Sequence, residues 1–308
     1  MRVKRKLWHW ILIIVLAWVF PFGILRFFPE HPMEEGDQPQ INQQIPVLLA
    51  TGQTVLMELE EYVCHAVAGE MPASFAQEAL KAQAVLCRTY ACKRVQQADK
   101  HPEGAVCTES TCCQAYSEVQ PPENILQAVA DTAGQVLTYN NALIEATYFS
   151  CSGGMTEDAV AVWGTDVPYL QAVESPGEEN SKHYLTTVHI TKKELSKALQ
   201  LELGRLEGNY ITQTTYTDGG GIASVQIGGE VFTGVQLRQL LGLKSTAITI
   251  TSVGDCVTIT TKGYGHRVGM SQYGADAMAI AGNNYLQILQ HYYQGVQITV
   301  FDKTLPFL

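Results

Sequence analysis

The sequence predicts an α+β protein: a mixed core with a central alanine-rich helix, an inserted mainly β subdomain, and one N-terminal transmembrane helix. Three observations support this prediction. The expected helices and strands follow one another without regular βα alternation, which is typical of α+β folds. Apolar residues make up 46% of the 308 residues and charged residues only 16%, as in globular proteins. One apolar run near the N-terminus is long enough to span a bilayer.

The N-terminus carries the clearest compositional signal. Residues 1–6, MRVKRK, form a basic tail, and residues 7–28 form an apolar run with aromatic residues toward both ends. A transmembrane helix needs about 20 apolar residues, and the positive-inside rule places the basic tail in the cytoplasm. We therefore expect a single-pass protein of the cell membrane whose remaining chain is extracytoplasmic. A cleaved signal peptide is the alternative, which the length of the run and the lack of a small-x-small cleavage site disfavour.

The exported part is expected to consist of a linker and a core with an insertion. Residues 29–45 are rich in Pro, Glu and Gln and lack periodicity, which indicates a linker. We expect the core to consist of residues 46–184 and 257–308, with residues 185–256 inserted between them as a subdomain. The net charge is −10 and there is no basic stripe, so the composition argues against binding of nucleic acid.

The first part of the core begins with a strand and two helices. TVLMEL at 54–59 predicts the strand, and residues 60–70 predict a short helix that ends in a kink at Gly69. Ser74 and Gln77 match a capping box for the second helix. Alanines and apolar residues then recur at helical spacing, so we expect a central helix that is packed on several sides.

The remaining elements follow in order along the chain. Thr191, with Glu194 three positions later, indicates the start of a helix in the insertion. Before it we expect a cysteine-bearing loop (100–116), a helix (121–134) and a hairpin (135–150), and the helix of the insertion spans 191–203. Short β runs follow at 209–260, with one short helix among them at 234–243. The last part has a strand (257–262), a glycine-rich loop (263–271), two helices (272–282 and 284–295) and a closing strand (296–301).

One carboxylate stands apart from the charged surface. Glu70 lies in GEMP, after Gly69, which lets the backbone turn sharply, and before Pro72. This placement predicts a side chain at the edge of a cleft. The alternative is that Glu70 favours the dipole of the helix that follows, a contribution of about 0.3–1 kcal/mol. A helix N-terminus lowers a carboxyl pKa, whereas a general acid near neutral pH needs a raised one, so a catalytic Glu70 has to be desolvated or aimed away from the helix axis.

Two glycine-bearing segments are further candidates. YFSCSGGMTED at 148–158 offers the hydroxyls of Ser150 and Ser152 beside a glycine pair, although an ordinary turn has the same composition. No GxSxG elbow is present, so a serine hydrolase is not supported. GYGHRVGMSQYGA at 263–275 places glycines around His266 and ends at an expected helix N-terminus, where backbone N–H groups can meet an oxygen-rich ligand. The alternative for His266 is a structural hydrogen bond.

Cysteines form a second kind of candidate site. An even number of cysteines in an exported chain is consistent with disulfides. The eight are Cys64, Cys87, Cys92, Cys107, Cys112, Cys113, Cys151 and Cys256. Four metal-capable side chains also lie within thirteen residues of loop, and this donor set suits a tetrahedral structural zinc site: His101, Cys107, Cys112 and Cys113. The adjacent Cys112 and Cys113 are awkward for a disulfide and crowded for one ion, so both interpretations stay open.

Three segments together resemble one family. AGEMPASFAQEALKAQAVLCRTYA, YFSCSGGMTEDA and GHRVGMSQYGA are similar to the stage II sporulation protein D family, of the SpoIID/LytB group. FTGVQLRQLLGLKS and YLQILQHYYQGVQI fit the same pattern, and the resemblance spans about residues 45–300. Two positions depart from it. Arg267 stands where the family usually has glycine, and Cys151 stands where other small residues are common.

The resemblance implies a peptidoglycan lytic transglycosylase, a lyase of glycan strands, that acts at the septum and the engulfing membrane of an endospore-forming bacterium. It implies that Glu70 is the catalytic acid and that the substrate is glycan already stripped of stem peptides. It also implies two partners, a sporulation amidase and a membrane protein that recruits both. Zinc is associated with members of the family that bear cysteine and histidine, and residues 101–113 are the matching place.

This chemistry agrees with a single carboxylate. Hydrolytic glycosidases generally use two. A lytic transglycosylase can use one, because its nucleophile is the C6 hydroxyl of N-acetylmuramic acid (MurNAc) in the substrate itself. Glu70 would protonate the oxygen that links MurNAc to N-acetylglucosamine (GlcNAc) and then take the C6 hydroxyl proton as the 1,6-anhydro product forms. We expect Glu78 and Asp158 to be structural. The residues expected to line the cleft or hold the sugar are Arg88, Ser152, Tyr264, His266, Ser271, Gln272 and Tyr273.

Two functions from other classes stay open. One is a non-catalytic cell-wall-binding activator of a partner amidase, for which Glu70→Gln would leave function intact. The other is a zinc hydrolase that uses the cysteine loop as an open metal site, for which chelation would abolish turnover. The glutamate of GEMP argues against the first, and cysteine-rich ligation argues against the second, because closed thiolate sites are usually structural.

Overall fold

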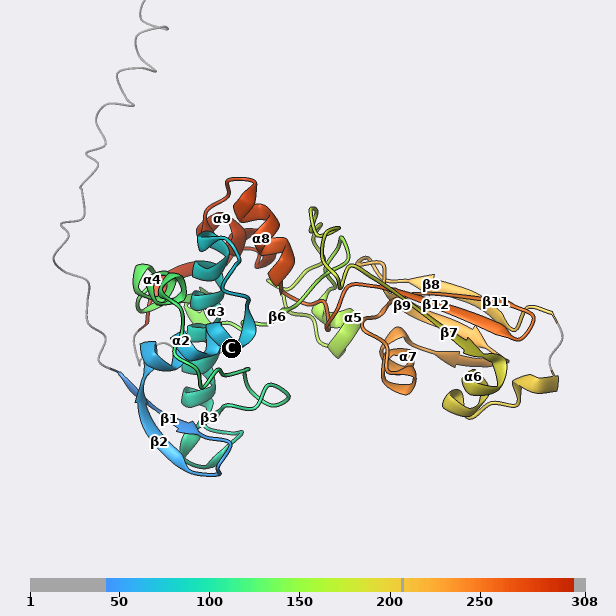
Figure 1. Ribbon diagram of the computed structural model, residues 1–308, viewed down its shortest axis with the longest axis horizontal. Coiled ribbons are helices and arrows are strands. Elements are labelled where there is room, and N and C mark those ends of the chain that lie inside the picture. Colours follow the sequence, from blue (N-terminus) through green and yellow to red (C-terminus); the bar gives the residue numbers. More distant parts are fainter. Residues whose placement is uncertain (1–42, 206–207, 302–308) are drawn as a thin grey trace, which may run out of the picture. The chain divides into compact units, whose positions relative to one another are not determined.

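The computed structural model describes residues 43–205 and 208–301, which contain helices mixed with several small sheets (Figure 1). This architecture confirms the α+β prediction. Two hydrophobic cores lie within it, one built from both ends of the described chain and one built from its middle. Among these residues, no helix is both long and apolar enough to cross a membrane.

The expected N-terminal segments lie largely outside the described residues. This applies to the tail at 1–6, the transmembrane segment at 7–28 and the linker at 29–45 up to its last three positions. The first strand, β1 (Gln44–Leu48), begins inside the expected linker, two residues before the expected start of the core.

The larger core joins elements that are far apart in the sequence. Its small sheets have the strand orders β2-β1-β3, β14-β4-β5 and β13-β6, so strands from both ends of the chain pair with strands from its middle. The elements are β1, β2 (Thr54–Glu58), α2 (Leu59–Glu70), α3 (Gln77–Gln97), a 3-10 turn (Pro102–Gly104), β3 (Val106–Cys107), α4 (Glu123–Asp131), β4 (Gln135–Tyr139), β5 (Ala142–Leu143), β6 (Tyr148–Phe149), α5 (Ala159–Trp163), β13 (Met270–Ser271), α8 (Gln272–Ile280), α9 (Tyr285–Tyr292) and β14 (Gln297–Val300).

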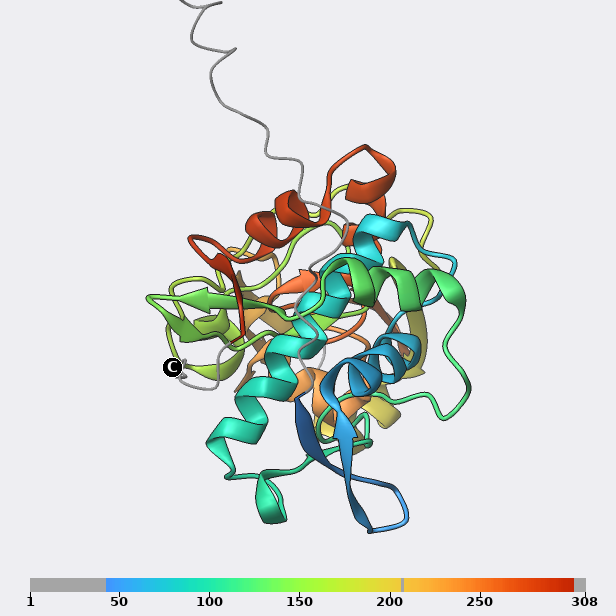
Figure 2. The same ribbon diagram turned by 90° about the vertical axis from the view of Figure 1, so that its left-hand side faces the viewer.

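Helix α3 is the centre of this core, as the alanine pattern predicts. It contacts α2, α4, α8, α9 and β4, and Figure 2 shows it in cyan with α2 in blue and α4 in green beside it. Ala79, Ala82 and Ala84 have no exposed surface. Such short side chains allow neighbouring helices to approach closely, because the distance between helix axes depends on the side chains at the contact.

The end of α2 differs from the prediction. The helix continues through Gly69 without a kink and ends with Glu70, and the Met71 N–H donates to the Val67 carbonyl to close the last turn. Glu70 therefore lies at the C-terminal end of a helix and not in a kink before the next one. The dipole at a helix C-terminus disfavours a negative charge, so the conflict expected from a helix N-terminus does not arise.

The start of α3 also differs from the prediction. The helix begins at Gln77 with Ala76 as its N-cap residue, and the expected capping box from Ser74 is not formed. Instead, the Asp276 carboxylate of α8 accepts a hydrogen bond from the Ala76 N–H at 2.7 Å. A carboxylate from a distant helix thus satisfies the N–H of the actual N-cap residue, whereas the expected box would have engaged the N–H groups of Ser74 and Gln77.

The smaller core lies mostly in the residues that were expected to form the inserted subdomain. Its two sheets are antiparallel, with the strand orders β11-β12-β7 and β10-β9-β8, and α6 and α7 pack against these strands (Figure 1). The capping box of Thr191 and Glu194 is formed, as predicted. The elements are β7 (Leu185–Thr191), α6 (Lys192–Leu199), a 3-10 turn (Leu203–Arg205), β8 (Ile211–Tyr216), β9 (Ile222–Ile227), β10 (Glu230–Phe232), α7 (Gly234–Leu241), β11 (Ala247–Val253) and β12 (Cys256–Lys262).

The subdomain extends beyond its expected C-terminal boundary at residue 256. Strand β12 crosses that boundary, since it pairs with β7 on one side and β11 on the other as far as Lys262. Val257 and Ile259 of β12 are buried in the smaller core while the residues between them are more exposed, as in a strand with one covered face.

Candidate active site

A cavity of about 430 Å³ opens at the end of α2. We call it the Glu70 cavity. Of the described residues that line it, only Glu70 carries a carboxylate. Its walls come from α2, α3, β6, the cysteine-bearing loop, the glycine-rich loop and the start of α8, and include Glu70, Tyr148, Phe149, Tyr264, His266 and Gln272. The structure therefore brings four of the predicted site residues together, namely Glu70, Tyr264, His266 and Gln272.

Gly69 allows a second chain segment to reach Glu70. The Ala115 N–H donates a hydrogen bond to Glu70 Oε1 at 2.6 Å. A Cβ atom at position 69 would lie 2.6 Å from the backbone nitrogen of Tyr116 and 2.7 Å from the carbonyl carbon of Ala115. The glycine before Glu70 is thus needed for this close approach and not for a sharp turn.

A row of buried polar side chains stands behind Glu70. Gln114 Nε2 donates to the Tyr148 hydroxyl oxygen at 2.9 Å, and the Tyr62 hydroxyl donates to Gln114 Oε1 at 3.2 Å. The Tyr148 hydroxyl also lowers the pKa of the Glu70 carboxyl group. Because Gln114 donates to the Tyr148 oxygen, the Tyr148 O–H is left to point toward Glu70 or toward Cys87 Sγ, 3.8 Å away.

Gln272 holds the backbone of Glu70. Its Nε2 atom donates to the Glu70 carbonyl at 3.0 Å and to Gln83 Oε1 at 3.4 Å. Gln272 therefore lines the cavity, as predicted, but its amide nitrogen is already engaged by the protein. This side chain positions the end of α2 against the start of α8.

The pKa of Glu70 suits a proton donor. Burial raises it above its ordinary value, and the hydrogen bonds from the Ala115 N–H and the Tyr148 hydroxyl lower it by a smaller amount. A general acid works best when its pKa lies near the operating pH, and for a glutamate this requires a raised value. The same two hydrogen bonds can stabilise the carboxylate once the proton has left.

His266 lines the cavity with an uncharged imidazole ring. Its Nδ1 atom accepts a hydrogen bond from the Val268 N–H at 3.1 Å, and its ring packs against Phe149 and Trp163 with centroids 5.6 and 5.7 Å away. Burial, and then the charge of Arg238, lower the pKa of His266 to about 4. The imidazole is therefore uncharged near neutral pH, so it does not supply a cation to Glu70 or to a ligand.

The two tyrosines of the glycine-rich segment have different positions. Tyr264 lines the cavity, is 37% exposed, and has its ring 4.8 Å from Lys244 Nζ. Tyr273 packs edge-on against Phe75, with ring centroids 5.1 Å apart, and lies near His183. Tyr264 is thus available to a sugar ring, whereas Tyr273 is not among the described residues that line the cavity.

Three further residues that were expected to bind substrate are instead structural. Arg88 is fully buried and makes a bidentate ion pair with Glu60, at 2.9 Å from Nε and 2.6 Å from Nη2. Ser152 is fully buried, and its hydroxyl donates to Glu178 at 2.9 Å. Ser271 is buried and caps the N-terminus of α8. Each has a protein partner where a ligand was expected. Glu78 and Asp158, expected to be structural, accept hydrogen bonds from backbone N–H groups.

The SCSGG segment forms a cradle for Glu178. This carboxylate, 2% exposed, accepts hydrogen bonds from the Ser152 and Gly153 N–H groups at 2.7 and 3.1 Å and from the Cys151 thiol at 2.9 Å. The Ser175 hydroxyl adds another at 2.5 Å. Gly153 has a φ of 74°, and a Cβ there would lie 2.7 Å from the backbone of Lys262 and Gly263. The small residues of the SCSGG segment therefore serve internal packing.

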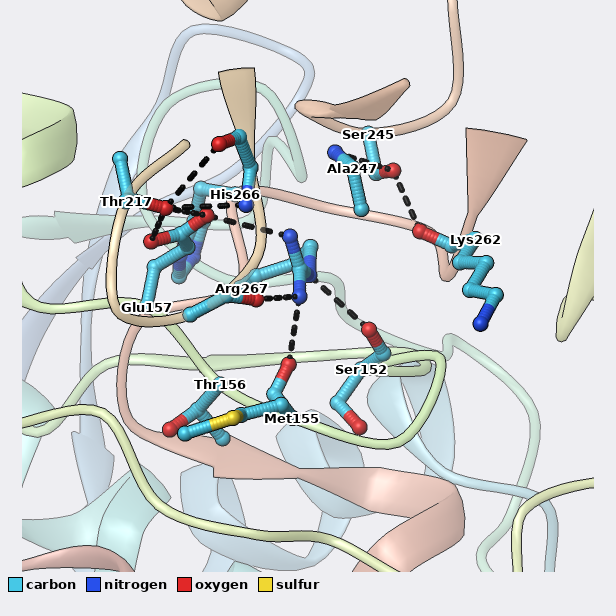
Figure 3. A network of polar contacts seen from close by, with 12 residues as sticks. Ser152, Met155, Thr156, Glu157, Thr217, Ser245, Ala247, Lys262, His266 and Arg267 are labelled. Carbon is cyan, nitrogen blue, oxygen red and sulfur yellow. Dashed lines mark hydrogen bonds and ion pairs between the residues drawn. The ribbon is translucent and has the colours of Figure 1, made fainter. Parts of the chain in front are cut away.

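Arg267, which departs from the resemblance described above, makes a network of polar contacts with the surrounding chain (Figure 3). Its φ is 68°, in the left-handed region that favours glycine. Its guanidinium pairs with Glu157 at 3.1 Å and donates to the carbonyls of Ser152, Met155 and Gly219 at 2.9, 2.7 and 2.6 Å. Gly219 belongs to the hairpin between β8 and β9, so this network links the inserted subdomain to the larger core.

The four predicted metal ligands lie together. Their donor atoms are all within 4.8 Å of one another, and His101 Nε2 is 3.3 Å from Cys112 Sγ and 3.5 Å from Cys113 Sγ. Tetrahedral zinc with ordinary bond lengths separates such donors by about 3.5–3.8 Å, so the set fits this ion. All eight cysteines are among the described residues and all are thiols, so the structure contains no disulfide at this loop. Gln114 and Ala115, which serve the Glu70 site, follow Cys113 directly.

Sequence reasoning missed the groups that hold Glu70. Tyr148 is the first residue of a segment that the sequence analysis singled out for its serines, and the alternation of side chains along β6 could have indicated it. Gln114 follows the vicinal cysteines and carried no signal of its own. The Ala115 group is a backbone N–H, which no residue type reveals.

Comparisons with known proteins agree with the resemblance of the motifs. The model of a family described as SpoIID, stage II sporulation protein, matches residues 50–139. The chain is 39% identical over 282 residues to stage II sporulation protein D of Bacillus subtilis (strain 168), covering 85% of this chain and 80% of the relative. It is 37% identical over 295 residues to the protein of the same name from Bacillus amyloliquefaciens, covering 89% and 86%.

A third relative carries a different name. The chain is 32% identical over 288 residues to a Bacillus subtilis (strain 168) protein named amidase enhancer, covering 76% of this chain and 40% of that protein. The identity and coverage of the two stage II sporulation proteins establish the assignment. This chain belongs to the stage II sporulation protein D (SpoIID) family.

Proposed function

We propose that the protein is a peptidoglycan lytic transglycosylase that cleaves the bond from MurNAc to GlcNAc in peptide-stripped glycan strands. It would act in septal wall remodelling and engulfment during endospore formation. The observation that carries the proposal is a single carboxyl group, Glu70, with a raised pKa, facing a cavity in which no other described lining residue bears a carboxylate. A hydrolase acting by the usual mechanisms needs a second carboxylate.

The proposed reaction uses Glu70 twice. In the first step, Glu70 gives its proton to the glycosidic oxygen while the bond from that oxygen to C1 of MurNAc breaks, and GlcNAc leaves as an alcohol. In the second step, the C6 hydroxyl oxygen bonds to C1 while its proton passes to the Glu70 carboxylate. Glu70 is protonated again at the end, and no water is consumed. The Ala115 N–H and the Tyr148 hydroxyl stabilise the carboxylate between the steps.

Aromatic groups at the cavity support a sugar ligand. Tyr264 is 37% exposed at the cavity. Trp163 is not among the described residues that line the cavity, but it packs against His266, which does, and it is 44% exposed. Flat aromatic faces with a polar atom at one edge suit the apolar faces and hydroxyl groups of a sugar ring. The proposal assigns these two side chains to the glycan strand and assigns the proton transfers to Glu70.

One relative favours a second candidate function. A protein named amidase enhancer is 32% identical over 288 residues, so we also consider a non-catalytic cell-wall-binding activator of a partner amidase. In that case the Glu70 cavity would bind glycan without cleaving it. The raised pKa of Glu70 supports the enzyme, because a residue that only binds neutral sugar has no need of it.

We also propose that His101, Cys107, Cys112 and Cys113 hold a structural zinc ion. The separation of their donor atoms supports this, and four protein donors leave no open position for substrate, which disfavours a zinc hydrolase. The ion would supply no chemistry to the reaction and would fix the loop that leads to Gln114 and Ala115. Chelation is expected to lower the thermal stability of the full-length chain and of its Glu70→Gln variant equally. An unchanged melting temperature after complete chelation would contradict a structural ion.

The cellular setting is proposed on the sequence. The apolar residues 7–28 support a retained single-pass anchor, with the described part of the chain on the extracytoplasmic side of the septal or forespore-engulfing membrane. A sporulation amidase and a membrane protein that recruits both enzymes are the proposed partners. The relative named amidase enhancer supports an amidase in this role.

The decisive experiment is mass spectrometry of the products that the full-length chain forms from peptide-free glycan strands. We expect 1,6-anhydro-MurNAc ends, and we expect Glu70→Gln to abolish them. Glu61→Gln, an exposed glutamate on the same helix, is the matched control and should leave the product unchanged. Reducing MurNAc ends would indicate hydrolysis. Absence of both products, with amidase stimulation retained in Glu70→Gln, would assign the activator function.

A further inference from the structure

A second cavity, of about 380 Å³, adjoins the Glu70 cavity. Tyr264 lines both, so the two cavities meet at this side chain. We call the second one the Arg238 cavity. Its walls come from α5, from α7 and from the segment that leads from α7 to β11, and they include Val162, Val235, Arg238, Leu243, Lys244 and Thr246.

The Arg238 cavity is cationic in a protein of net charge −10. Arg238 is partly buried, which lowers its pKa, and among the described residues no carboxylate pairs with it. Lys244 is exposed, and its Nζ atom lies 4.8 Å from the Tyr264 ring. The pKa of His183 is lowered first by burial and then by the charges of Lys182 and Lys244. Lys182 is therefore a further cation near Lys244. A partly desolvated guanidinium without an acidic partner favours an anionic ligand.

A buried hydroxyl in the same wall also lacks a partner. Thr246 is only 4% exposed, and its Oγ1 atom has no hydrogen bond within the described structure. Leaving a buried hydroxyl unpaired is unfavourable, and native structures rarely do so without a reason. Thr246 lines the cavity, but its Oγ1 atom is buried close to Gly221, so this hydroxyl is not among the groups that can meet a ligand.

The rest of the wall is apolar. Val162, Val235 and Leu243 line the cavity beside the cations. The combination of cations and aliphatic side chains fits a small substituent that has a carboxylate and a methyl group on the same carbon. The lactyl ether at C3 of muramic acid is such a group. In a strand with stem peptides its carboxyl is tied up as a neutral amide, and it becomes a free carboxylate only when that amide has been hydrolysed.

Resting on the proposed function, we propose that the Arg238 cavity binds the free lactyl carboxylate of a muramic acid next to the cleavage site. Arg238 and Lys244 are its cationic partners, and the lactyl methyl packs on Val162 and Val235. The recognition of peptide-free strands then resides in the inserted subdomain, away from Glu70.

The test compares two forms of one ligand. The ligand is a peptide-free tetrasaccharide of alternating GlcNAc and MurNAc, used with free lactyl carboxylates or with the same groups converted to methylamides. Binding is measured by calorimetry on the full-length Glu70→Gln chain, which does not turn over. We expect the carboxylate form to bind about tenfold or more tightly than the amide form, as for a hydrogen-bonded ion pair.

Two variants localise the preference. Arg238→Gln and Lys244→Gln, each in the Glu70→Gln background, should each reduce the preference for the carboxylate several-fold without weakening binding of the amide form. Lys244 is exposed, so its variant stays informative even where Arg238→Gln fails to fold. Lys193→Gln removes the same charge from an exposed position on α6 and is the matched control.

The outcomes separate this inference from the proposed function. Equal binding of both forms, or a preference that survives both variants, overturns the carboxylate site even where anhydro ends are produced. Equal binding of both forms, together with binding of inorganic phosphate that is lost in both variants, assigns the cavity to a phosphate group and also overturns it. A preference lost in the variants, in a chain that yields no anhydro ends, keeps the site and rejects the transglycosylase.

Discussion

Glu70 and Glu178 are both carboxylates held by backbone N–H groups, yet their surroundings differ. Glu178 is 2% exposed and accepts five hydrogen bonds, from two backbone N–H groups, two hydroxyls and a thiol. Glu70 accepts one hydrogen bond, from the Ala115 N–H at 2.6 Å, has the Tyr148 hydroxyl nearby, and faces a cavity. A carboxylate has about four acceptor positions. A saturated carboxylate holds the fold together, whereas one with acceptor positions to spare can exchange a proton with a ligand.

The first prediction tests the open carboxylate. Glu70→Gln should reduce formation of 1,6-anhydro ends by about 10²–10⁴-fold, because an amide cannot act as general acid or base. Initial rates on peptide-free glycan measure the loss. A variant with more than a tenth of the native rate would show that Glu70 is not the proton donor.

The same substitution has a predictable effect on stability. Burial raises the pKa of Glu70 in the folded chain above its unfolded value. The stability that this group contributes is therefore present at low pH and is lost as the pH rises through the folded pKa. The melting temperature of Glu70→Gln relative to the native chain should thus increase between pH 4 and pH 8. A constant difference across this range would contradict the raised pKa.

The second prediction tests the saturated carboxylate. Glu178→Gln places an amide nitrogen, a donor, against N–H and O–H groups that need acceptors, so it should destabilise the chain by about 2–4 kcal/mol. Urea unfolding measures this change, and the neighbouring exposed Glu179→Gln is the control. A loss below about 0.5 kcal/mol, the range of ordinary surface substitutions, would show that the cradle is not structural.

The third prediction concerns the approach to Glu70. Gly69→Ala puts a Cβ 2.6 Å from the Tyr116 backbone, so the segment that carries the Ala115 N–H must move away from the carboxylate. Loss of one hydrogen bond to a charged group should lower kcat by about 10–100-fold. Gly204→Ala is the control, because its Cβ would meet nothing within 4 Å. An unchanged kcat in Gly69→Ala would remove Ala115 from the mechanism.

The fourth and smallest prediction concerns Tyr148. Its hydroxyl lowers the pKa of Glu70, so Tyr148→Phe should raise that pKa further and move the alkaline limb of the kcat/KM profile to higher pH. We expect the maximal rate to change by less than about tenfold, the equivalent of 1.4 kcal/mol. Tyr285→Phe removes a hydroxyl that bonds Gln135 and should leave the limb in place. A shift to lower pH would reverse the assigned role.

The features that the sequence predicted correctly are those that depend on residues close together in the chain. The alanine repeat indicated α3 as the central helix, and Thr191 with Glu194 indicated the start of α6, because these signals act within a few residues. Ser74 with Gln77 carried the same signal but failed, since the helix begins only at Gln77 and Asp276 of α8, two hundred residues away, binds the N–H of its N-cap residue, Ala76. A capping pattern thus misplaces a helix start where a distant group stabilises a later one.

The candidate site shows the same limit. Glu70 and its cavity neighbours Tyr264, His266 and Gln272 were indicated by motifs. Ser152 was indicated equally strongly, but its partner is Glu178, which has no pattern around it and is brought there only by tertiary folding. Small and polar residues in a motif show that something approaches closely. They do not show whether it is a ligand or the chain itself.

Arg267 has a consequence for how the family can vary. A side chain in the left-handed region costs about 1–2 kcal/mol, which the four contacts of the guanidinium offset. A glycine at 267 would relax the backbone but leave the Glu157 carboxylate, 1% exposed, without its cation. The two positions should therefore covary among homologues, with an acid at 157 where 267 is basic and an uncharged residue at 157 where 267 is glycine.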